Sequence, residues 1–172
     1  MTIVTISIII AAAIYVIYNT FALKFFGVPK SLSNTYYLYK DRWNIGFLFP
    51  IMMYLVTGFM MPAWITLSEG SMFQFLSFLA PAGLAFVGTA PAFKSSSLEN
   101  NVHTWSAYLA AAFSLLWVIL VTPFWWTILV WLGIILVSAV LTKTFKSSLV
   151  YWLEQIAFGA TLTSIILFGI LF

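Results

Sequence analysis

Apolar residues in this sequence are grouped into six long runs that short polar breaks separate. A helix that crosses a bilayer needs about 20 mainly apolar residues. The runs that approach this length cover residues 2–23, 45–67, 72–93, 102–121, 124–142 and 149–172. Turn-forming residues fill the breaks, so consecutive helices should run antiparallel. The pattern predicts an all-α integral membrane protein, with residues 1–172 forming a single compact bundle of about six transmembrane helices.

The longest connection, residues 24–44, has a pattern of its own. Pro29 begins it, and Ser31 or Ser33 can cap a short helix over residues 36–39. Tyrosines followed by Lys40 and Arg42 are typical of a segment that lies along lipid headgroups. We therefore expect a short interfacial helix between the first two spans, acting either as an anchor or as a lid over a cavity.

Composition narrows the class of protein. The chain is 63% hydrophobic and only 6% charged, which is too few charges to cover a water-soluble globule. It has no cysteine and one histidine, so thiolate sites and multi-histidine zinc or haem sites cannot form within one chain. No phosphate-binding or dinucleotide motif is present. No metal, cofactor or nucleic-acid partner is predicted.

The basic residues predict an orientation. With the N-terminus outside, the cytoplasmic loops are 24–44, 94–101 and 143–148, and short cytoplasmic loops carry the excess of Lys and Arg. These loops hold all seven basic residues: Lys24, Lys30, Lys40, Arg42, Lys94, Lys143 and Lys146. Seven of the eight tryptophans fall near predicted span ends, which agrees with interfacial belts. We expect a plasma (inner) membrane protein with both termini extracytoplasmic.

Small residues and prolines bear on packing within the bundle. The third and fourth runs are rich in Gly and Ala, which lets helix backbones approach closely, so these two helices should pack together at the bundle centre. Four prolines fall inside the second and third runs and predict kinks there. They are Pro50, Pro62, Pro81 and Pro91.

Polar side chains within or beside the spans are the candidate ligand or proton sites, because polar groups inside a membrane are costly. They gather towards the cytoplasmic half, and they are Glu154, His103, Gln155, Asn44, Asn19, Arg42 and Asp41. On the fourth helix, His103 shares a stripe with Ala107, Ala110 and Ser114; on the sixth, Glu154 shares one with Ala157, Thr161 and Ser164. If the stripes face each other, Glu154 can pair with His103 or Arg42. The alternatives are that Glu154 extends to the interface and that His103 simply begins a helix. No catalytic residue is assigned.

One segment has a family resemblance. The stretch from Val87 to Pro91, followed by His103 and Ala107, is distantly similar to small multi-helix bacterial membrane families and to the membrane hydrolases that include alkaline ceramidases. Those hydrolases bind zinc through several histidines, and this chain has one, so no site residue is transferred.

Three functions follow as hypotheses. The first is a non-enzymatic membrane protein that binds a lipid or a membrane partner through a polar cavity on the cytoplasmic side and self-associates as a homo-oligomer. The second is a small oligomeric transporter or channel with Glu154 and His103 as a proton or cation relay. The third is a membrane-embedded lipid-modifying enzyme with His103 as the base.

Overall fold

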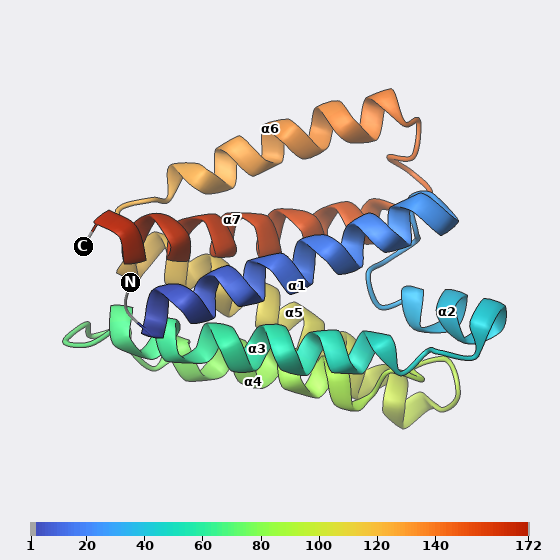
Figure 1. The fold of residues 1–172 in the computed structure, drawn as a ribbon, viewed down its shortest axis with the longest axis horizontal. Helices are drawn as coiled ribbons and strands as arrows, with labels where there is room; N and C mark the ends of the chain where they lie inside the picture. The colour runs from blue at the N-terminus through green and yellow to red at the C-terminus, as the bar shows by residue number, and fades with distance from the viewer. Residues whose placement is uncertain (1–2, 172) are drawn as a thin grey trace.

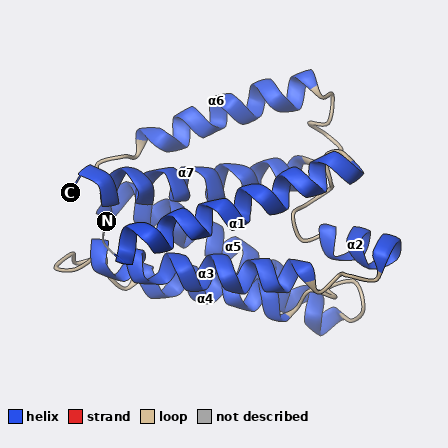
Figure 2. Cartoon of the chain, in the orientation of Figure 1, coloured by secondary structure: helices blue, strands red, loops and turns tan. Residues whose placement is uncertain are grey.

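The computed structural model describes residues 3–171, and every regular element in this range is a helix (Figure 2). The all-α class predicted from the sequence is confirmed. The helices of this range are α1 (Ile3–Phe26), α2 (Thr35–Trp43), α3 (Leu48–Leu67), α4 (Leu76–Thr89), α5 (Ser97–Val121), α6 (Trp126–Leu141) and α7 (Leu149–Leu171). The short α2 lies in the connection where the sequence predicts a short helix.

The apolar helices fall into two groups by length. Within residues 3–171, α1, α3, α5 and α7 are long and apolar enough to cross a membrane. The apolar helices α4 and α6 have 14 and 16 residues. At the usual rise these are about 21 and 24 Å long, which is less than the roughly 30 Å hydrocarbon core. The chain thus has four helices of membrane-spanning length in this range, where the sequence predicts six spans.

Several boundaries differ from those predicted, for local reasons. Residues 71–75 form turns, in which the Ser71 hydroxyl accepts the Phe73 N–H, so α4 begins only at Leu76. It ends at Thr89, which leaves Pro91 beyond the helix. Pro50 lies in the first turn of α3, where backbone N–H groups have no intrahelical partner to lose. Pro50 and Pro91 therefore do not interrupt a helix, whereas Pro62 and Pro81 lie inside helices.

The start of α5 also differs from the prediction, since it begins at Ser97 rather than at residue 102. Ser96 has an extended backbone, and its hydroxyl accepts the Glu99 N–H, as in a helix N-cap. Residues 100 and 101 lie inside its first turns. The outermost residues of the first and last predicted spans, Thr2 and Phe172, lie outside the described range.

The helices form a ring with one helix outside it. Helix α1 packs on α3, α3 on α4, α4 on α5, α5 on α7, and α7 returns to α1, while α3 also reaches α7 across the ring (Figure 1). Helix α6 lies outside this ring and packs mainly on α7 (Figure 1). The side chains buried most completely inside the ring include Val56, Met60, Trp64, Trp117 and Ile165. The core thus lies between the five ring helices.

The two ends of the bundle have different chemistry. Helix α1 begins and α7 ends at one end of the molecule, whereas α2 and the loops after α4 and α6 lie at the opposite end (Figure 1). All seven Lys and Arg residues belong to α2, to these loops, to the α1–α2 loop or to the last turn of α1. We refer to this as the basic end.

Close approach of α4 and α5 depends on small residues, as the sequence predicts. A Cβ atom added to Gly83 of α4 would lie 2.9 Å from the Cβ of Ala110 on α5. The contact between these two helices is the most extensive in the bundle. The pair forms part of the ring wall, because α4 packs between α3 and α5, and does not occupy the centre.

Candidate functional site

Glu154, in the second turn of α7, is half-buried at the basic end of the ring. Its Oε2 accepts a hydrogen bond from the backbone N–H of Leu32 at 2.5 Å, and Leu32 is 1% exposed. The same loop also contacts the start of α7, where Tyr151 donates its backbone N–H to the Lys30 carbonyl at 3.2 Å. This N–H belongs to the first turn of the helix and would otherwise lack a partner. Glu154 therefore helps to hold the α1–α2 loop on α7.

Asn19 and Gln155 meet in a buried network between α1 and α7. Gln155 Nε2 donates to Asn19 Oδ1 at 3.0 Å, and the Tyr15 hydroxyl donates to Gln155 Oε1 at 2.9 Å. The Tyr151 hydroxyl donates to Asn19 Oδ1 at 3.3 Å, and Asn19 Nδ2 donates to the Tyr15 carbonyl at 3.0 Å. The network satisfies both amides away from water, so it specifies how α1 packs on α7. The two tyrosines were not singled out from the sequence.

The contacts of His103 are with residues other than Glu154. His103 is 5% exposed, its Nδ1 is 3.0 Å from the Ala90 carbonyl oxygen, and its ring stacks on Phe93 with centroids 4.6 Å apart. Both partners belong to the end of α4 and the loop that follows. The hydrogen bond that the structure gives to Glu154 comes from Leu32, and His103 is not among the side chains around the cavity described below.

Asp41, Arg42 and Asn44 belong to the exposed end of α2. Arg42 Nη1 donates to the Phe25 carbonyl at 3.0 Å, and its guanidinium lies 4.8 Å from the Trp43 ring centroid. Asn44 ends the helix with φ 58°, a left-handed conformation that asparagine tolerates well. Asp41 is exposed. These three residues lie at the C-terminal end of α2 and do not line the cavity.

Helix α2 is anchored through Tyr39, which is fully buried. Its ring packs edge-on against Tyr18 and Phe26 of α1. Burial disfavours the phenolate and raises the pKa of Tyr39 to about 12. The side chain therefore stays neutral at physiological pH.

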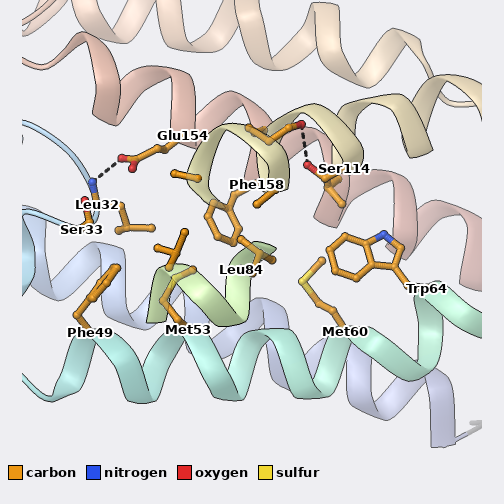
Figure 3. A pocket seen from close by; sticks show the side chains of 16 residues that line it. Leu32, Ser33, Phe49, Met53, Met60, Trp64, Leu84, Ser114, Glu154 and Phe158 are labelled. Atoms are coloured by element: carbon orange, nitrogen blue, oxygen red, sulfur yellow. Dashed lines mark hydrogen bonds between the residues drawn. The ribbon is translucent and has the colours of Figure 1, made fainter. Parts of the chain in front are cut away.

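A narrow cavity runs through the ring from Glu154 to Trp64 (Figure 3). The volume of this cavity is about 50 Å³. Its walls come from α3, α4, α5, α7 and the α1–α2 loop, and the lining residues are Leu32, Ser33, Phe49, Met53, Met60, Trp64, Leu84, Val87, Ala107, Ala110, Ala111, Ser114, Glu154, Ala157, Phe158 and Thr161. Most of this lining is apolar.

Most residues of the two stripes expected from helical spacing face this cavity, whereas Ser164 instead hydrogen-bonds Thr127 of α6 at 2.8 Å. Ala107, Ala110 and Ser114 line it from α5, and Glu154 and Thr161 line it from α7. His103 belongs to the α5 stripe by spacing, but it lies one turn beyond the cavity and contacts the α4–α5 loop. Helical periodicity in the sequence thus identified residues of the α5 and α7 walls. The end of the cavity depends on where the loops lie, which periodicity does not show.

Two buried polar atoms on the cavity wall have no hydrogen-bond partner. They are the Trp64 indole Nε1 and the Thr161 hydroxyl. Such orphaned groups are uncommon in folded proteins and call for an explanation, often a water or a ligand. From the sequence, Trp64 was interpreted as an interfacial tryptophan, yet it is fully buried. It lies in the last turn of α3, and spacing alone does not show that its side chain turns into the ring core.

Among residues 3–171, no group of three His, Asp or Glu side chains is placed to hold a metal ion. The arrangement instead offers an apolar passage with a carboxyl group at one end and an indole N–H at the other. No protein-family model, curated protein or solved structure matches this chain.

Proposed function

We propose that this chain is a membrane protein that holds a single-chain amphiphile, a lipid or a lipid-like molecule, in the cavity between α3, α4, α5 and α7. The observation that carries the proposal is the cavity itself: an apolar passage inside a membrane-type bundle, with polar groups at its two ends. Ligand pockets commonly combine mostly apolar walls with a few polar groups that orient the ligand.

The shape of the cavity favours one unbranched chain. Phe49 and Trp64 mark its two ends on α3 and lie about 22 Å apart at the usual helical rise. A volume of about 50 Å³ is small for a cavity whose lining extends over that length. It favours one extended alkyl chain over a fused ring system.

The polar groups on the wall suit a ligand with polar atoms. The Glu154 carboxyl group at one end of the passage can hold a polar head group (Figure 3). The apolar side chains between Glu154 and Trp64, such as Met53, Leu84 and Phe158, contact the chain. An amphiphile satisfies both parts of the lining, which a purely apolar or purely polar molecule does not.

The proposal includes a topology. We infer that α4 and α6 also cross the membrane, so that the bundle spans it six times with both chain ends outside and the basic end in the cytoplasm. The support is the concentration of Lys and Arg at one end of the bundle, as expected for a cytoplasmic side. Trp117 of α5 donates to the Ser68 hydroxyl before α4, and Phe93 after α4 stacks on His103 of α5. Turns held by neighbouring helices in this way support a crossing by a short helix. A plasma membrane location belongs to this proposal.

The test is to purify the protein from its membrane and identify bound lipids by native mass spectrometry. Ala111 lines the cavity and Ala112, next to it on α5, is exposed on the outside of the bundle. We expect wild-type protein and the control Ala112→Phe to retain a bound single-chain lipid. Ala111→Phe fills the passage and should lose it.

Equal retention in both variants would contradict the proposal, because the lipid would then lie elsewhere. The apolar groove between α1 and α7, lined by Ile8, Ala12 and Gly169, is one such place. Absence of any bound lipid from the wild-type protein would also count against it.

A further inference from the structure

Glu154 is the only ionisable side chain among the described residues that line the cavity. Lys, Arg and His are all absent from its wall. The carboxyl group lies at the end of the row of lining side chains, beside Leu32 and Ser33 (Figure 3). Any molecule that fills the passage therefore brings one of its ends to a carboxyl group.

The carboxyl group has no cationic partner in the described part of the chain. Its one hydrogen bond there comes from the Leu32 backbone N–H. Lys30, on the same loop as Leu32, is exposed. Arg42 donates to the Phe25 carbonyl, and Lys94 donates to Asn34 Oδ1 at 2.9 Å. A carboxylate in an apolar wall is stabilised most by a cation that also donates hydrogen bonds.

We propose that the amphiphile bound in this cavity carries a protonated amine head, which lies at Glu154, with its alkyl chain directed towards Trp64. The inference rests on the proposed function and names the class of ligand. An ammonium group has three N–H donors, and Glu154 together with the Ser33 hydroxyl at the same end offers acceptors for them. A carboxylic acid of the same chain length would place a like charge against Glu154.

Competition among three ligands that differ only in the head group tests this. Purified protein in a neutral maltoside detergent is loaded with tritiated hexadecylamine and challenged with unlabelled hexadecylamine, hexadecanol or hexadecanoic acid near pH 7. We expect the amine to displace the probe at a concentration roughly tenfold lower than the alcohol, as for a charge-assisted contact, and the acid to be weaker still. An alcohol or acid that competes as well as the amine overturns the inference.

Variants of Glu154 sharpen the result. In Glu154→Gln the amine and the alcohol should compete equally, whereas Glu154→Asp should keep the preference for the amine. Glu69→Gln, at the opposite end of the bundle, is the matched control and should behave as wild type. Unchanged amine preference in a folded Glu154→Gln protein contradicts the inference. If that variant does not fold, the wild-type series above still decides.

The two proposals fail in distinguishable ways. If the alcohol binds and Ala111→Phe abolishes its binding, but the amine has no advantage, the cavity function stands and the amine head is wrong. If no ligand binds, or if binding is unaffected in Ala111→Phe, both are wrong. Preference for the amine that is lost in Glu154→Gln and sensitive to Ala111→Phe supports both.

Discussion

Single glycines set how closely the outer helix approaches the ring. A Cβ atom added to Gly159 of α7 would lie 2.3 Å from the indole ring of Trp131 on α6. The Trp131 N–H also donates to the Thr163 hydroxyl at 3.0 Å, which fixes the ring over that glycine. A side chain at Gly159 must therefore displace Trp131 or push α6 away from α7.

Gly159→Val should destabilise the bundle by about 1–3 kcal/mol through this overpacking. Gly133→Val on α6 is the matched control, because a Cβ atom added there meets nothing within 4 Å. Titration of both proteins with a denaturing detergent, followed by tryptophan fluorescence, measures the difference. Equal losses of stability in the two variants would show that the Trp131 contact does not limit the approach of α6.

At the scale of elements, the hydrophobic pattern located the helices better than it located their ends. The apolar runs predicted each long helix, because burial in lipid or in the core needs a continuous apolar segment. The pattern could not find the five mostly polar residues, 97–101, that α5 gains at its start. Ser96 followed three residues later by Glu99 is a capping signal, and it would have placed the helix start correctly.

For the candidate site, the sequence predicted residues of the cavity wall but not the loop contacts at its end. Helical spacing placed Ala110, Ser114 and Glu154 on facing walls, and the structure puts them there. The α1–α2 loop, which supplies Leu32 to Glu154, was beyond prediction, since a contact across 122 residues leaves no local pattern. His103 was joined to Glu154 by spacing alone, and the loop after α4 instead supplies its partner.

Ser96→Ala should cost about 1 kcal/mol, because the Glu99 N–H at the start of α5 loses its acceptor. Ser97→Ala, one residue further and exposed, should change stability by less than about 0.5 kcal/mol. The two variants are compared by denaturing-detergent titration and by hydrogen exchange of the first-turn amides. Exchange that is equally fast in wild type and Ser96→Ala would argue against the cap.

At the scale of the whole molecule, the absence of cysteine makes the topology directly measurable. Single cysteines at Ser71 and Ser95 flank α4, and those at Pro123 and Ser147 flank α6. In intact cells, a membrane-impermeant maleimide should label Ser71→Cys and Pro123→Cys. Ser95→Cys and Ser147→Cys should react only after the membrane is permeabilised, because they lie at the basic end.

Labelling of both members of a pair from the same side would show that the helix between them does not cross. A reversed pattern throughout would leave six spans and invert the orientation. The four sites therefore separate the number of spans from the direction in which the bundle lies.

The hydrogen bond between Leu32 and Glu154 links the α1–α2 loop to the cavity. An amine bound as proposed would share the carboxylate with the Leu32 N–H, and any movement of Oε2 towards the amine would weaken the hold on the loop. Thermodynamic reciprocity would then require that contacts which draw the loop away strengthen binding inside the ring. On this proposal, the surroundings of the α1–α2 loop would influence how tightly the bundle holds its ligand.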